Sequence, residues 1–196
     1  LMPMMQQATD PHSLFELRRR LLELDKLLSL GSVARARGLI GELAQHSALE
    51  RDLVTRRILL AQLEDDHPEA IRLAREALQT RSTDPGLWRS LATSLLAASR
   101  PDSARLALDR FIAHHPNRRS ASVVAVDQCL GAGRPGMAVA LIDSLRPFLQ
   151  ETTFLARQRA VGLLLLDRQP EAAGQVSAEL RANPYNLSLI RTELLD

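Results

Sequence analysis

The stretch PGLWRSLATSLLAASRPDSARLALDRFIAHHPNR, residues 85–118, decides how this chain folds. It contains two runs rich in alanine and leucine, which are strong helix formers, and each run opens with a proline. Proline is well placed in the first turn of a helix, because the N–H that it lacks has no partner there and its fixed φ suits the helix. The stretch therefore predicts two helices joined by a tight turn.

Prolines followed by helical runs recur along the chain at a nearly constant spacing. They lie 33, 34 and 35 residues apart, at Pro68, Pro101, Pro135 and Pro170. Second breaks fall between them, at residues 84–86, 115–117 and 183–184. Each period therefore holds two helices of about 13–16 residues with tight turns between them.

A two-helix period of this length resembles the tetratricopeptide repeat (TPR). Residues 85–118 match the family pattern best. The first helix has its large and small residues in the expected order, at Trp88, Leu91, Ala92 and Leu95. The second helix has Ala104, Leu108 and the closing Pro116, and it departs from the pattern at Phe111. The alanines let two helix backbones approach closely, while Trp88 and Leu95 fill the space beside them.

The resemblance extends over residues 12–196 and implies an all-α, right-handed superhelical solenoid of antiparallel helix pairs. We expect a linker at 1–11, units near 12–48, 51–84, 85–118, 119–152 and 153–184, and a terminal helix at 185–196 that is either a cap or half of a repeat. Arg57 stands where the pattern expects leucine. The packing positions expected in the outer units are Leu21, Leu22, Ala34, Gly38, Ala70, Ala74, Ala77, Ala125, Cys129, Ala138, Ile142, Leu145, Ala160, Val161, Leu164, Ala173 and Leu180.

Composition excludes several classes of protein. Aromatic residues make up only 3% of the chain, too few for a sandwich or barrel core. A net charge of +2 gives no field that would favour nucleic acid or an anionic membrane, and no apolar run reaches the roughly 18 residues of a membrane span. A single cysteine, Cys129, permits no intrachain disulfide. Because the basic residues are nearly all arginine and the chain starts at Leu1, we expect part of a longer, bacterial protein.

The sequence GAGRPG at residues 131–136 matches the dinucleotide-binding pattern GxGxxG, and residues 122–126 before it could form a strand. The repeat contradicts that interpretation. The same slot holds residues 98–102 one unit earlier and residues 166–170 one unit later, and neither segment is suited to a pyrophosphate. We interpret these glycines as the end of a helix and a tight turn.

The remaining candidates for chemistry have simpler structural explanations. His114 and His115 fall at a helix end, where a cation favours the helix dipole, and no metal-binding spacing accompanies them. Cys129 falls on a packing stripe. Residues 64–66 form an acidic turn that favours the start of the next helix, and residues 18–20 form an arginine run that Glu16 and Glu23 can pair with. We therefore predict no catalytic residue, no cofactor and no metal.

The resemblance implies binding of another protein or peptide on a concave face lined by the first helix of each pair. The groove positions mapped from the family are Thr55, Leu59, Arg89, Thr93, Val123, Asp127, Gln158 and Gly162. Chaperone-binding members of the family hold a carboxylate with a lysine and an asparagine at the first two groove positions of a unit. Here those positions hold Thr55 and Leu59, Arg89 and Thr93, or Val123 and Asp127, and none of these pairs matches. We expect no nucleic-acid partner, and self-association through the terminal helices stays open.

Two classes of function follow from the resemblance, and both are non-catalytic. The first is an interaction scaffold like the periplasmic helical portions of bacterial exopolysaccharide export proteins, which organise enzymes in front of an outer-membrane pore. The second is a cytoplasmic adaptor, a secretion or pilus-assembly chaperone, or the sensor domain of a regulator. Localisation is open between the two compartments, with the periplasm favoured by the export resemblance. A signal peptide upstream would support export, whereas a kinase, receiver or DNA-binding domain would contradict it.

Overall fold

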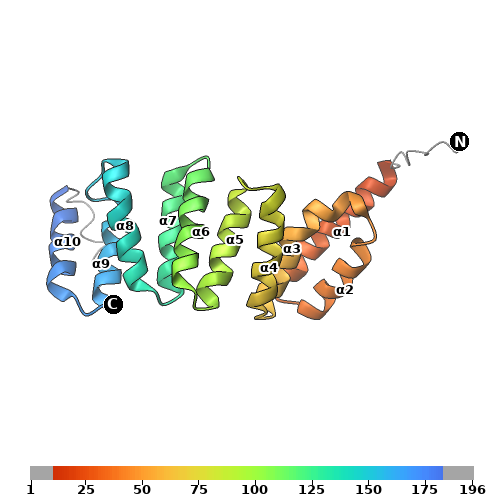
Figure 1. The fold of residues 1–196 in the computed structure, drawn as a ribbon, viewed down its shortest axis with the longest axis horizontal. Coiled ribbons are helices and arrows are strands. Elements are labelled where there is room, and N and C mark those ends of the chain that lie inside the picture. The colour runs from red at the N-terminus through yellow and green to blue at the C-terminus, as the bar shows by residue number, and fades with distance from the viewer. Residues whose placement is uncertain (1–10, 183–196) are drawn as a thin grey trace, which may run out of the picture. The chain divides into compact units, whose positions relative to one another are not determined.

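The computed structural model describes residues 11–182, and every regular element in this range is a helix (Figure 1). Within the described range there is no β-strand, which confirms the predicted all-α fold. The expected terminal helix at 185–196 lies outside the described residues. So does the expected linker, except that Pro11 begins the first helix.

The chain divides into two compact units, of which the first comprises Leu1–Ser82. Its described helices are α1 (Pro11–Ser29), α2 (Val33–Leu43), the short 3₁₀ helix η1 (Ser47–Leu49), α3 (Glu50–Leu63) and α4 (His67–Thr80). Helix α1 packs on α2, and α3 packs on α4 and also contacts α1 and α2. Leucines fill the centre of this unit, and Leu24, Leu43 and Leu53 are fully buried.

The second unit comprises Thr83–Asp196. It contains α5 (Pro85–Ala97), α6 (Pro101–His114), α7 (Arg118–Gly131), α8 (Pro135–Leu149), α9 (Ala156–Leu165) and α10 (Gln169–Ala182). Each helix packs on the next, as Figure 1 shows, and α7 also contacts both α5 and α9. The first helices of the three pairs in this unit therefore lie in one row.

The turns within the helix pairs repeat at a constant interval. A residue with left-handed backbone, at φ between +55° and +66°, occurs every 34 residues, at Gly31, Asp65, Ser99, Gly133 and Asp167. At each turn this N–H donates to the carbonyl three residues back, and the next N–H donates to the carbonyl five residues back, over 2.9–3.2 Å. These two bonds satisfy helix-end carbonyls in the Schellman arrangement.

This constant interval explains the unequal spacing of the prolines. Pro101 and Pro135 are the first residues of α6 and α8, whereas Pro68 and Pro170 are the second residues of α4 and α10. Both positions belong to the first turn, where proline is tolerated. The helices that begin with or next to these prolines therefore start 34 residues apart, at His67, Pro101, Pro135 and Gln169.

The expected packing positions are correct in the central units and wrong near the ends. Buried as predicted are Ala70, Ala74, Ala77, Leu91, Ala92, Leu95, Ala104, Leu108, Phe111, Ala125, Cys129, Ala138, Ile142, Leu145 and Ala160. Trp88, Leu21, Val161 and Leu180 are half-buried.

Two errors of register account for the exposed positions. Leu164 and Ala173 are exposed, and Leu163 and Ala172 are buried in their place, because Pro170 is the second residue of its helix and not the first. At the N-terminal end Leu22, Ala34 and Gly38 are exposed. The buried alanine there is Ala36, which lies 34 residues before Ala70, and no proline marks that turn in the sequence.

Side chains cap several helix starts. Asp66 accepts a hydrogen bond from the N–H of Glu69 at 3.1 Å, as expected for the acidic turn, and Asp84 accepts one from Leu87 at 3.2 Å. Asn117 does the same for Ser120 at the start of α7. Each cap satisfies an N–H that the first helical turn leaves without a partner.

Candidate partner-binding site

All the predicted groove residues lie on the first helices of the pairs. Thr55 and Leu59 are exposed on α3, in the first unit. The remaining ones belong to the second unit, on the row formed by α5, α7 and α9: Arg89, Thr93, Val123, Asp127, Gln158 and Gly162. This row brings the second-unit candidates onto neighbouring helices.

Arg89 and Asp127 are the two charged candidates, and both are exposed. Among the described residues neither makes an ion pair, in contrast to arginines such as Arg56, Arg72 and Arg159. Val123 and Gln158 are half-buried beside them on α7 and α9. Among the predicted groove positions that the structure describes, Arg89 and Asp127 are thus one positive and one negative side chain without an ion pair.

Thr93 and Gly162 have structural roles. The Thr93 hydroxyl donates to the Arg89 carbonyl at 3.1 Å and accepts a hydrogen bond from Gln128 Nε2 at 2.8 Å, which ties α7 to α5. Gly162 is buried, and a Cβ there would lie 2.8 Å from Val139 Cγ2. Gly162 is therefore a close-packing position against α8, and its expected place in the groove is wrong.

Arg89 also lines a small pocket of about 210 Å³ at one end of α5, α6 and α7. Its other lining residues are Pro85, Gly86, Phe111, His115, Ser120, Ala121 and Val124. The Phe111 and His115 rings meet edge to face, 5.5 Å apart. The volume is below the roughly 300–1,000 Å³ of typical ligand pockets, so it suits at most a single side chain.

A larger pocket of about 540 Å³ lies wholly within the first unit, between the N-terminal half of α3 and the C-terminal half of α4. It is lined by Ser47, Ala48, Glu50, Arg51, Val54, Arg57, Leu73, Glu76, Ala77, Thr80 and Arg81. Sequence reasoning missed this pocket. The one feature that indicated it was Arg57, which stands where the repeat pattern expects a leucine.

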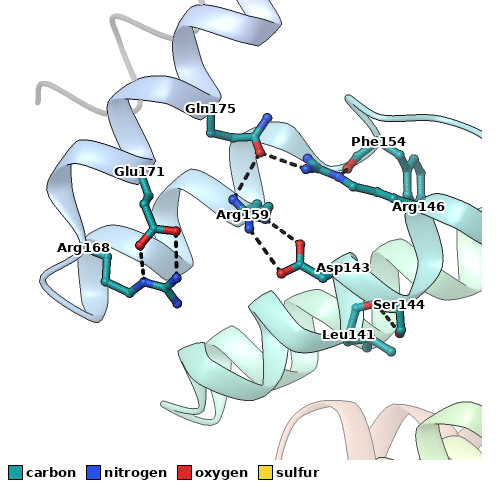
Figure 2. A network of polar contacts seen from close by, with 9 residues as sticks. All are labelled: Leu141, Asp143, Ser144, Arg146, Phe154, Arg159, Arg168, Glu171 and Gln175. Carbon is teal, nitrogen blue, oxygen red and sulfur yellow. Dashed lines mark hydrogen bonds and ion pairs between the residues drawn. The ribbon is translucent and has the colours of Figure 1, made fainter.

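A polar network joins the last three helices of the second unit (Figure 2). Arg159 on α9 pairs with Asp143 on α8 at 2.7 Å, and Arg146 on α8 donates to Gln175 Oε1 on α10 at 2.9 Å and to the Phe154 carbonyl at 3.0 Å. Burial, followed by the nearby Arg159 charge, lowers the pKa of Arg146. Because Gln175 is buried and these groups bind one another, the network holds helices together rather than forming an open site.

The other candidate groups also have structural roles. Arg19 pairs with Glu16 as expected, but Arg20 pairs with Glu42 on α2 and with neither Glu16 nor Glu23. Burial raises the pKa of the Cys129 thiol to about 11, so it is protonated and unreactive at neutral pH.

The glycine motif at 131–136 spans the turn between α7 and α8, and residues 122–126 are helical. Gly133 occupies the slot that Ser99 and Asp167 fill in neighbouring turns, which confirms the turn interpretation.

Within residues 11–182, no group of three or more acidic, histidine or cysteine side chains is placed to hold a metal ion. None of the helices that the structure describes combines the length and apolar character of a membrane span.

Residues 61–126 match the family model described as tetratricopeptide repeat. Two similar solved structures are a putative kinesin light chain from Podospora anserina with nearly identical TPR-like repeats and a point variant of the same protein. The first is 16% identical with a TM-score of 0.58 and covers 86% of this chain and 97% of its own. The second is 15% identical with a TM-score of 0.60 and covers 91% and 95%.

No curated protein sequence matches the chain significantly. At these identities the structural likeness establishes the fold, while the family model rests on the central third of the chain. Residues 61–126 are thus similar to the tetratricopeptide repeat, and the fold of the chain is like that of the two TPR-like repeat structures.

Proposed function

We propose that this protein is a non-catalytic interaction scaffold that binds a partner protein or peptide along the first helices of its second unit. The observation that carries the proposal is that Arg89 on α5 and Asp127 on α7 are exposed on neighbouring helices and make no ion pair within residues 11–182. TPR folds generally mediate protein–protein interaction, and TPR proteins are typically scaffolds rather than enzymes.

Arg89 is one of several described arginines without an ion pair, and what sets this surface apart is that an exposed arginine and an exposed aspartate lie on neighbouring first helices. Among the described residues, at least nine arginines do form ion pairs with carboxylates: Arg19, Arg20, Arg37, Arg56, Arg72, Arg105, Arg119, Arg159 and Arg168. Solvated charges such as Arg89 and Asp127 cost little stability in the free protein, but across an interface they select a partner of complementary charge. Removing them should therefore change binding more than folding.

The proposal is tested by reversing both charges, with Arg89→Glu and Asp127→Arg in one chain. Affinity capture from the native organism should lose the bound partner, and the melting temperature should stay nearly unchanged because both side chains are exposed. The matched control is Arg110→Glu, which changes an exposed arginine on α6, the second helix of its pair. This variant should capture the partner as the native chain does. Equal capture by the double variant and the native chain would remove Arg89 and Asp127 from the site.

The cellular setting is a further part of the proposal. Membership of an exopolysaccharide export assembly in the periplasm is one setting, and a cytoplasmic adaptor, chaperone or sensor domain is the other. The sequence that flanks this chain in its gene decides between them. A signal peptide upstream supports export, and a kinase, receiver or DNA-binding domain contradicts it.

A further inference from the structure

The pocket of the first unit is large enough for a ligand and is not part of the groove proposed above. Its volume of about 540 Å³ falls within the range of typical ligand pockets. Neither Thr55 nor Leu59 lines it, and all its lining residues belong to the first unit. It is therefore a separate candidate site.

The pocket exists because large apolar side chains are missing there. Residues 51–84 and 85–118 correspond at an interval of 34, which is the interval of the turns. Where the second stretch has Trp88, Leu91 and Phe111, the first has Val54, Arg57 and Ala77, and all three of these line the pocket. Leu91 and Phe111 are buried, with 5% and 4% of their surface exposed. The first unit thus leaves a larger space open than the second unit, where Phe111 lines a pocket of only about 210 Å³.

The walls combine arginines with aliphatic side chains. Arg51 and Arg57 line the pocket and form no ion pair among the described residues, and Arg81 also lines it. Two carboxylates line it as well, but Glu76 accepts a 2.6 Å hydrogen bond from Arg72, which leaves Glu50 as the lining carboxylate without such a bond. The aliphatic part consists of Val54, Leu73 and Ala77.

We infer that this pocket binds an acidic peptide segment that carries an aliphatic side chain, presented by a partner protein. Guanidinium groups bind carboxylates through paired hydrogen bonds, and the aliphatic wall takes the apolar side chain. A nucleic acid fits less well, because no aromatic residue lines the pocket to stack on a base. Of the two lining arginines without an ion pair among the described residues, Arg57 is half-buried and Arg51 is exposed, so Arg57 is the main contact, since a partly desolvated charge interacts more strongly than an exposed one.

The inference is tested by isothermal titration calorimetry on the full chain, with the blocked peptide acetyl-Glu-Asp-Leu-Glu-Asp-amide as the probe. We expect saturable binding with one site per chain that weakens as salt is raised. The matched peptides replace the acids by Gln and Asn, or the Leu by Gly, and both should bind at least about tenfold more weakly. Binding of the neutral peptide with equal affinity would overturn the inference, and so would the absence of binding by the acidic one.

Two variants give residues 51–84 the large apolar side chains that residues 85–118 have at the corresponding positions. Arg57→Leu removes the charge, and Ala77→Phe fills the space with the residue found 34 positions later. Each should weaken binding of the acidic peptide by about tenfold or more while the melting temperature holds or rises, which separates lost binding from lost folding. If Ala77→Phe fails to fold, Arg57→Leu still decides. The control is Arg75→Leu, an exposed arginine of α4 that does not line the pocket.

Two further binding measurements test which class of ligand the pocket binds and whether the pocket is independent of the groove. A deoxythymidine hexamer should bind more weakly than the acidic peptide, and tighter binding of the hexamer would overturn the peptide assignment. The double variant Arg89→Glu, Asp127→Arg should bind the peptide as the native chain does, so failure of the groove and failure of this pocket are distinguishable. Unchanged peptide affinity in Arg57→Leu would also overturn the inference.

Discussion

Residues 51–84 and 85–118 share one backbone arrangement and differ in the side chains that lie between their helices. Both contain two helices with a left-handed residue at the turn, Asp65 in the first and Ser99 in the second. In the second stretch Leu91 is buried and the pocket that Phe111 lines holds only about 210 Å³, whereas in the first their counterparts Arg57 and Ala77 line a pocket of about 540 Å³. The backbone of these two repeats therefore depends on their turns and small residues, while their large side chains differ.

The largest expected effect comes from opening the filled stretch. Phe111→Ala should lower the free energy of unfolding by about 3–5 kcal/mol, because it removes a buried ring and leaves a cavity. Urea unfolding followed through the fluorescence of Trp88, the single tryptophan, measures it. The control Phe148→Ala alters an exposed ring under Arg118 and should cost about 1 kcal/mol or less. Equal costs for the two variants would contradict the difference in packing.

A smaller effect should separate the two second helices at their starts. Asp66 caps α4 through the N–H of Glu69, whereas its counterpart Arg100 makes no side-chain cap on α6. Asp66→Ala should therefore cost about 1 kcal/mol of unfolding free energy, and Arg100→Ala should cost close to none. Thermal unfolding by circular dichroism measures both changes. A loss in Arg100→Ala as large as that in Asp66→Ala would show that the cap is not the cause.

The smallest effect concerns the exposed side of α4. Arg72 binds Glu69 and Glu76 there, whereas the corresponding positions on α6 are Ser103, Leu106 and Arg110. The hydrogen bond from Arg72 lowers the pKa of Glu69 below its usual value. The contribution of ionised Glu69 to stability is therefore complete above the pKa of about 4.3 that a glutamate has in the unfolded chain. It is lost as the pH falls through the lower pKa that Glu69 has in the folded protein.

Glu69→Gln should accordingly lower the unfolding free energy by about 0.5 kcal/mol or less at neutral pH and low salt, since the pair is solvent-screened. Denaturation curves of the two proteins should converge as the pH falls through the folded pKa, and also in high salt. A difference that persists in acid would assign the loss to something other than this ion pair.

The fold was largely predictable because its signals are local. Prolines in the first turns of second helices and alanines at close helix contacts indicate the two-helix period directly. The exact register was less predictable, since the turn residues Asp65, Ser99 and Asp167 are not glycines and their side chains do not indicate a left-handed backbone. Where no proline marked the turn, near Gly31, the expected packing positions were consequently wrong.

The candidate sites were less predictable because they depend on contacts between distant residues. The groove positions followed from the repeat, and they stay a proposal. Gly162 showed how the mapping fails, since a neighbouring helix occupies the space above it. The pocket was indicated by Arg57 alone, because its volume arises from the joint absence of large side chains on α3 and α4. The Arg146–Gln175 bond joins residues 29 apart, which no local pattern reveals.

The most direct test of the difference between the two stretches is an NMR titration of the ¹⁵N-labelled chain with the acidic peptide acetyl-Glu-Asp-Leu-Glu-Asp-amide. Amides within residues 47–57 and 73–81, the two segments that contain all the residues lining the larger pocket, should shift in a saturable way. The amides of residues 86–91 and 107–115, in the corresponding segments of the second stretch, should stay in place. Shifts of equal size in both stretches, or shifts confined to the filled one, would contradict the account.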